Sequence, residues 1–131
     1  MSTIDEFKKI EMKIGTILSA EYILGADKLL KLSVDFGLKE KKVTIEEGAE
    51  QAEAGEERGD ESDVRQILSG IREYYAPEQL VGKQCPFVTN LEPRTLRGLV
   101  SEGMILAVKT KDGSAVLLHP DKKTEAGSML S

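Results

Sequence analysis

The sequence of 131 residues lacks tryptophan and contains a single cysteine and a single histidine. Cys85 has no second cysteine with which to form an internal disulfide, which fits a reducing compartment. It lies in an apolar stretch, so we expect a core position. His119 precedes a proline, which is typical of a turn, and one histidine provides neither a spaced set of metal ligands nor a nucleophile–base pair. No glycine-rich phosphate loop is present either. We therefore expect no enzymatic activity, no metal and no cofactor.

Long apolar runs are also missing. No stretch approaches the roughly 18 apolar residues that a membrane-spanning helix needs. Residues 1–9 carry charges where a signal peptide has its apolar segment. These two observations predict a cytoplasmic protein. A start at Met1 favours a stand-alone chain, although a domain excised from a longer protein could begin in the same way.

Aromatic residues are scarce, at 5% of the chain. Sequence-tolerant binding of single-stranded nucleic acid depends on aromatic side chains on which bases stack. The three phenylalanines, Phe7, Phe36 and Phe87, occupy apolar positions of the pattern, and Tyr74 and Tyr75 lie beside a predicted helix. Most of these rings are therefore expected in the core. The composition does not favour a general single-strand binder.

The net charge of −5 is unevenly distributed along the chain. Residues 39–63 contain ten carboxylates and four basic side chains, a local charge of −6, whereas the rest of the chain carries +1. A chain of this length suits one domain with one core. We therefore expect a single domain, 1–131, with a solvated acidic insert at about 39–63. The acidity of this insert does not exclude an anionic partner for the remaining body.

Alternation of apolar and polar residues predicts the strands. Five main strands are expected at residues 10–18, 30–36, 64–69, 84–89 and 102–108, with a further short strand at 115–118. Gly15 stands where the apolar phase changes, which predicts a bulge or a sharp bend. Pro86 predicts that its strand lies at an edge or contains a bulge. Val43 and Ile45 also alternate with polar residues, so strand pairing could continue into the insert.

Helices and loops complete the pattern. Ile4 and Phe7 have helical spacing, which predicts a short helix at 4–9 that covers one end of a barrel. Pro77 and Gly82 are suitable limits for a second short helix. Residues 20–28 and 91–100 are expected to be loops. Five strands with a helix between the third and fourth is the order of an OB-fold, a partly open five-stranded Greek-key barrel. A split barrel or a small sandwich gives a similar order.

Five ordered stretches resemble one family. They are FKKIEMKIGTI at residues 7–17, GADKLLKLSV at 25–34, SGIREYYAPEQLVGK at 69–83, NLEPRTLRGLVSEGM at 90–104, and LHPD at 118–121 followed by Gly127. The chain resembles the tRNA-binding domain family, which includes the C-terminal domains of methionyl-tRNA synthetases, stand-alone tRNA-binding dimers and the cytokine-like synthetase cofactor of animals. The resemblance covers residues 7–127 apart from the insert. It implies an OB-fold that binds tRNA without catalysis and serves protein biosynthesis.

The family resemblance also implies partners. Stand-alone members form homodimers in which the segment after the fifth strand takes part, here residues 115–131. Association with a methionyl-tRNA synthetase is a further option. A sister branch acts as an export-related chaperone but lacks the Ser-x-Gly-Met block that is present here at Ser101–Met104, so this block favours the tRNA branch. The departures from the family are the insert and Glu102. A chaperone-like dimer and a pure synthetase-assembly module stay open as alternatives.

OB-folds bind nucleic acid on the face of their second and third strands and through the loops that join strands 1–2 and 4–5. On this chain, those places predict eight RNA-binding residues: Lys28, Lys31, Arg65, Asn90, Arg94, Arg97, Ser101 and Met104. The cations would neutralise phosphates and release counterions. Each of them could instead serve solubility alone.

The uncharged candidates have a structural alternative as well. In the family, Ser101 and Met104 are expected to contact RNA through a hydroxyl and an adaptable apolar surface. Residues of these types could equally be the boundary and the core of a strand. Asn90 could read a base or close the turn before Pro93. Because stacking platforms are few, we expect recognition of tRNA shape and backbone.

Overall fold

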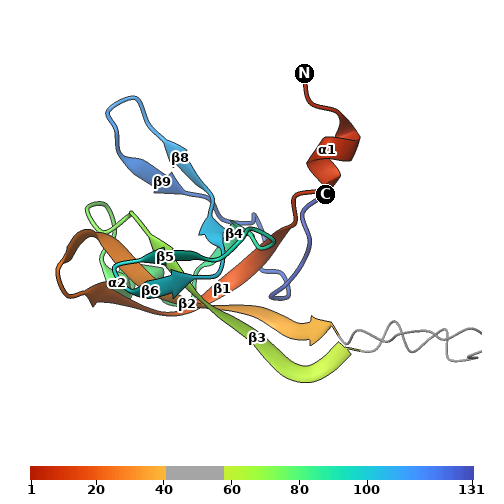
Figure 1. The fold of residues 1–131 in the computed structure, drawn as a ribbon, viewed down its shortest axis with the longest axis horizontal. Coiled ribbons are helices and arrows are strands. Elements are labelled where there is room, and N and C mark those ends of the chain that lie inside the picture. The colour runs from red at the N-terminus through yellow and green to blue at the C-terminus, as the bar shows by residue number, and fades with distance from the viewer. Residues whose placement is uncertain (41–57) are drawn as a thin grey trace, which may run out of the picture.

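A computed structural model describes residues 1–40 and 58–131 of the chain. The described elements are, in order, α1 (Ile4–Lys8), β1 (Met12–Ile23), β2 (Ala26–Glu40), β3 (Arg58–Ser69), α2 (Pro77–Leu80), β4 (Gln84–Val88), β5 (Arg94–Leu96), β6 (Leu99–Ser101), β7 (Met104–Ile105), β8 (Ala107–Lys109) and β9 (Ala115–Leu117). The long strands β1, β2 and β3 form a coiled sheet, and the two small hairpins β5–β6 and β8–β9 project from it (Figure 1). Within residues 1–40 and 58–131, no helix is long and apolar enough to span a membrane.

The main sheet is antiparallel and has the order β3-β2-β1-β4-β7. Thr16 marks the point where β1 changes partner, because it is opposite Asp35 of β2 and also opposite Gln84 of β4. The barrel closes on its other side, where the Glu102 amide donates to the Gln66 carbonyl at 2.8 Å and Gln66 Nε2 donates to the Val100 carbonyl at 2.9 Å. A partly open five-stranded barrel with α2 between β3 and β4 is the OB-fold. The predicted fold class is therefore confirmed.

Gly15 of β1 lies against two core side chains of β2, Val34 and Phe36. A Cβ at this position would lie 2.4 Å from Val34 Cγ1 and 2.7 Å from Phe36 Cε1, so only glycine fits without displacing the core. The predicted irregularity of β1 exists, but the register shift lies between Ile17 and Ser19, after the glycine. Gly15 thus leaves room for the side chains of Val34 and Phe36 in the core.

The core lies inside the barrel and contains Ile17, Leu30, Leu32, Val34, Phe36, Ile67, Leu80, Cys85 and Phe87. The rings of Phe36 and Phe87 meet edge to face with centroids 5.3 Å apart, as aromatic pairs prefer. The core positions predicted for Cys85, Phe36 and Phe87 are confirmed.

The N-terminal helix differs from expectation. No residue of α1 is buried, and the side chain of Phe7 is 42% exposed, so the helix does not cover an end of the barrel. It stands apart from the sheet in Figure 1. Its first turn is stabilised locally, by a capping box between Thr3 and Glu6. The helical spacing of Ile4 and Phe7 therefore indicates an apolar face whose two residues are both exposed.

Both predicted loops are hairpins. The segment 20–28 continues β1 and β2 up to the pair Ile23 and Ala26, around a turn in which Gly25 has a φ of 81°. The segment 91–100 forms β5 and β6 around Arg97 and Gly98, whose φ angles are 53° and 78°. Two successive residues of positive φ form the tight turn that suits a two-residue hairpin. The polar composition indicated long loops, but one or two residues with a positive φ are sufficient to reverse the chain.

Two strand predictions also need correction. The predicted strand 102–108 is divided into β7 and β8, because the chain leaves the barrel after Ile105 and forms a hairpin with β9. Pro86 is not at an edge, since β4 lies between β1 and β7. The residue opposite Pro86 is Ile14, whose carbonyl accepts from the Gly127 amide at 2.7 Å, so β1 needs no donor from Pro86. A proline is accommodated in the middle of the sheet for that reason.

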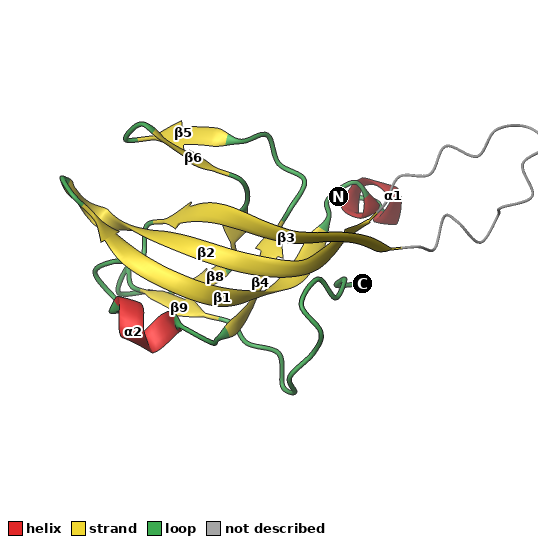
Figure 2. Ribbon diagram, turned by 90° about the horizontal axis from the view of Figure 1, so that it is seen from below, coloured by secondary structure: helices red, strands yellow, loops and turns green. Residues whose placement is uncertain are grey.

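The ends of the predicted acidic insert belong to strands. Leu38 is opposite Ser62 and Glu40 is opposite Arg58, so β2 and β3 continue as a hairpin beyond the barrel (Figure 2). Lys39 and Glu61 form an exposed ion pair across it, at 3.6 Å. Leu38, Lys39, Glu61 and Ser62 are exposed on this arm, so the presence of charged residues does not exclude a strand. The possible strand at Val43 and Ile45 lies outside the described residues.

Candidate nucleic-acid interface

The β1–β2 turn and the β5–β6 hairpin pack against each other at one end of the barrel. Their contact is an apolar cluster in which Ile23, Ala26 and Leu68 are buried and Leu29, Leu96 and Leu99 are packed around them. A hollow of about 190 Å³ lies here, lined by Ala26, Asp27, Lys28, Leu29 and Arg97. Figure 2 shows the β5–β6 hairpin standing over one side of the sheet near this turn. We call the surface formed by the two hairpins the hairpin face.

Three of the predicted cations gather on the hairpin face. Lys28 and Arg97 line the same hollow, and Arg94 is exposed on β5. Arg97 is brought there by its turn conformation, with the positive φ that the hairpin requires. Within residues 1–40 and 58–131, none of the three forms an ion pair. Their charges are therefore available to an anionic ligand.

Lys31 lies on β2, further along the sheet, and has a carboxylate partner. Its Nζ is 3.0 Å from Glu21 Oε1, directly across the β1–β2 ladder. It lines a groove of about 350 Å³ together with Arg65 and Glu102, among others. Two carboxylates, Glu21 and Glu102, also line this groove. Their negative charges offset the positive charges of Lys31 and Arg65. A phosphate at Lys31 would have to compete with Glu21.

Arg65 makes its contacts inside the protein. Its guanidinium forms a double interaction with the Asp63 carboxylate, through Nε at 3.0 Å and Nη2 at 3.1 Å. Nη1 donates to the Thr89 carbonyl at 2.6 Å, and the guanidinium also lies over the Phe36 ring. Such planar double contacts are the strong form of arginine binding. Arg65 thus joins β3 to the end of β4, and few of its donors remain for RNA.

Ser101 and Asn90 are also held by the backbone. Ser101 is 5% exposed, and its Oγ accepts from the Leu68 amide and donates to the Gly103 carbonyl, both at 3.0 Å. Asn90 Oδ1 accepts from the Glu11 amide at 2.8 Å, and its Nδ2 donates to the Lys9 carbonyl at 2.7 Å. These contacts favour the structural alternative for both residues.

Met104 is the exception within its block, because its side chain is 44% exposed on β7. Its neighbour Gly103 has a backbone role: a Cβ there would lie 3.0 Å from the Val88 carbonyl oxygen. In this block, then, the serine and the glycine shape the strand and the methionine presents an apolar surface.

Sequence reasoning missed Arg72. Its Nη1 donates to the Ala26 carbonyl at 2.8 Å, and its guanidinium lies over the Tyr22 ring at 4.5 Å. Arg72 therefore fixes the β1–β2 turn on which the hairpin face depends. No local pattern signals this role, because the partners are 46 and 50 positions away in the sequence.

Comparisons with known proteins agree with this geometry. A family model described as "Putative tRNA binding domain" matches residues 53–129. The methionine–tRNA ligase of Bacteroides fragilis is 38% identical over 124 residues, which are 95% of this chain and 15% of the ligase. The ligase of Methanococcoides burtonii is 40% identical over 128 residues, 98% of this chain and 15% of that protein. The chain thus spans about 15% of the length of these relatives.

Solved structures match over the whole chain. A MetRS-related protein of Pyrococcus horikoshii has a TM-score of 0.77 and 32% identity, covering 100% of this chain and 98% of that one. The chaperone CsaA of Bacillus anthracis has a TM-score of 0.74 and 27% identity, covering 100% and 99%. Since the family model covers more than half of the sequence, the chain belongs to the tRNA-binding domain family.

Proposed function

We propose that the chain binds tRNA without catalysing a reaction, and that the hairpin face is its binding surface. The observation that carries this proposal is the grouping of Lys28, Arg94 and Arg97 on two packed hairpins, with no ion pair among the described residues. Membership of the family supports tRNA as the ligand. The cytoplasm is the proposed setting, because that is where tRNA serves protein biosynthesis.

In this proposal the cations of the hairpin face neutralise backbone phosphates and release counterions. Met104 offers an adaptable apolar surface to a ribose or a base. Arg65 and Arg72 act as positioning residues, since they hold β3 and the β1–β2 turn in place. Aromatic platforms are few, and Arg72 lies over one face of the exposed Tyr22 ring. Recognition through the shape and backbone of tRNA is therefore favoured over base stacking.

The test is an electrophoretic shift assay with bulk tRNA over a series of salt concentrations. Three or four phosphate contacts predict that log K falls with log salt with a slope of about −2 to −4. The alternative is a chaperone, which the likeness to CsaA of Bacillus anthracis raises. A chaperone should suppress aggregation of an unfolded client with little dependence on salt. Suppression of aggregation without binding of tRNA would reject the proposal in favour of that alternative.

We also propose that two copies of the chain associate through residues 115–131. Val116, Leu118 and Met129 expose apolar side chains in this segment, and Met129 is 60% exposed although its backbone bridges to Lys13 of β1. Sedimentation equilibrium should report a dimer of the parent chain, and Leu118→Glu should give a monomer. The matched control Leu24→Glu places the same charge on the exposed β1–β2 turn and should leave the dimer intact. A monomeric parent would contradict this proposal.

Association with a methionyl-tRNA synthetase is proposed as a further partnership, which the similarity to the ligases supports. In this role the chain would supply tRNA affinity to an enzyme that carries the chemistry. Addition of the chain should lower the KM of the synthetase for tRNA and leave kcat unchanged. An unchanged KM at saturating concentrations of the chain would contradict it.

A further inference from the structure

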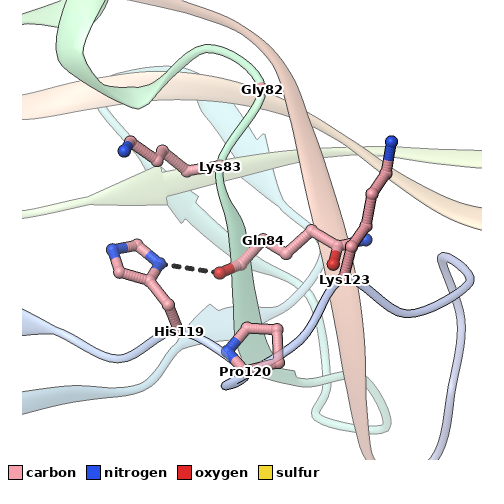
Figure 3. A pocket seen from close by; sticks show the side chains of 6 residues that line it. All are labelled: Gly82, Lys83, Gln84, His119, Pro120 and Lys123. Carbon is pink, nitrogen blue, oxygen red and sulfur yellow. Dashed lines mark hydrogen bonds between the residues drawn. The ribbon is translucent and has the colours of Figure 1, made fainter.

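A second basic hollow lies at the start of β4, away from the hairpin face. It measures about 370 Å³ and is lined by Gly82, Lys83, Gln84, His119, Pro120 and Lys123 (Figure 3). Three of these side chains are basic, and no carboxylate among the described residues lines the hollow. Glu78 lines an adjoining hollow with Lys83 and His119, so the basic lining belongs to this hollow alone, in a chain whose net charge is −5.

Gln84 fixes both walls of the hollow. Its backbone carbonyl accepts from His119 Nδ1 at 2.8 Å. Its side-chain Nε2 donates to the Thr124 carbonyl at 2.7 Å, and its Oε1 accepts from the Thr124 amide at 3.0 Å. The residue is 9% exposed, so these bonds are largely shielded from water. The ring of His119 and the backbone beside Lys123 are therefore held in place relative to β4.

The same contacts determine which groups are left for a ligand. A carbonyl can only accept, so His119 Nδ1 carries the hydrogen and Nε2 is the free ring atom. The backbone amides of Gly82 and Lys83 already donate to the Ile17 and Leu80 carbonyls. Neither Lys83 nor Lys123 forms an ion pair in the described part of the chain. The ligand would thus be bound by side chains and not by these backbone amides.

We propose that this hollow is a phosphate-binding pocket. In Figure 3, Lys83 and His119 extend on one side of the start of β4 and Lys123 rises on the other. Ammonium groups are compact charges that suit the several oxygens of a phosphate, whereas a planar carboxylate matches the fork of an arginine. The volume exceeds that of one phosphate ion, so the pocket admits a phosphate that is part of a larger molecule.

The phosphate has two possible sources. It could belong to a small molecule or to the backbone of an RNA, and the second source rests on the proposed function. The β5–β6 hairpin and α2, which directly precedes the hollow in sequence, lie on opposite sides of the sheet (Figure 2). An RNA phosphate in the pocket would therefore be a different one from those at the hairpin face.

The first experiment titrates the full chain with inorganic phosphate at constant ionic strength, followed by NMR. The amides of residues 82–84 and 119–123 should shift and saturate. In Lys83→Gln and Lys123→Gln, the dissociation constant should rise about tenfold each, as expected for a charge-assisted hydrogen bond. The double variant Lys109→Gln, Lys111→Gln, which removes two positive charges from the β8–β9 hairpin, should bind phosphate like the parent. Shifts that do not saturate, or that persist in the Lys83 and Lys123 variants, would overturn the proposal.

The second experiment separates the two sources. If RNA phosphate occupies the pocket, the salt slope of tRNA binding should become shallower by about 1.4 to 1.8 in the Lys83→Gln, Lys123→Gln double variant. An unchanged slope together with saturable phosphate binding assigns the pocket to a small phosphate-bearing molecule. Should the parent fail to bind tRNA, the proposed function fails, while the phosphate titration still decides the pocket.

Discussion

The double variant Arg94→Gln, Arg97→Gln tests the hairpin face quantitatively. Both guanidinium groups are exposed and make no ion pair among the described residues, so their removal should change binding and leave the fold intact. Each phosphate contact contributes about 0.7 to 0.9 to the slope of log K against log salt. Two lost contacts should make the slope shallower by about 1.4 to 1.8. At about 0.1 M salt, this corresponds to a loss of roughly 40-fold in tRNA affinity.

The assay is a filter-binding titration with bulk tRNA at four or more salt concentrations. The matched control is Lys109→Gln, Lys111→Gln, which removes the same charge from the β8–β9 hairpin. Surface changes of this kind alter the free energy of unfolding by no more than about 0.5 kcal/mol, which urea unfolding can verify. An equal loss of affinity in the control would mean that only net charge matters. A parent-like slope in the Arg94→Gln, Arg97→Gln variant would refute the location of the site.

Three further predictions concern stability, each measured by urea unfolding. Ser101→Ala removes the buried acceptor of the Leu68 amide and should lower the free energy of unfolding by about 1–3 kcal/mol, with little change in tRNA affinity of the folded protein; an unchanged stability would restore the RNA-contact interpretation. Gly127→Ala should cost about 2 kcal/mol or more, because φ is 91° and the new Cβ would lie 2.1 Å from the Phe36 carbonyl oxygen; a parent-like stability would contradict this close contact. Burial raises the pKa of Cys85 from 9.0 to about 11, so the unfolded state loses its thiol proton first and stability should fall as pH rises from 9 to 11. That part of the pH dependence should disappear in Cys85→Ala, and its persistence there would assign it to another group.

The sequence predicts much of the barrel because its strands alternate regularly. Leu30, Leu32, Val34 and Phe36 alternate with polar residues, and all four are buried. Local patterns do not report how far a strand continues once it leaves the core. The charged residues at the ends of β2 and β3 indicate that this part of the chain is exposed to solvent. An exposed hairpin arm is consistent with such a sequence, and so is a loop.

The candidate site was predictable in its location more than in the roles of its residues. The fold class predicts where the hairpin face lies on the barrel. The exposure of Arg94 and Arg97 follows from the polar sequence around them. The roles of Asn90 and Arg65 depend on partners distant in sequence: Asn90 bonds to residues 79 and 81 positions away, and Arg65 bonds to Thr89. Residue type alone cannot distinguish a hydrogen bond to RNA from one to a distant strand, because the same donor serves both.

Photo-crosslinking of tRNA to the parent chain, with the crosslinked residues mapped by mass spectrometry, tests the central claim most directly. We predict crosslinks at Arg94–Leu96, at Leu99–Ser101 and at residues 26–31, all reduced by raised salt. Absence of crosslinks, or crosslinks confined to α1 and residues 115–131, would contradict tRNA binding at the hairpin face.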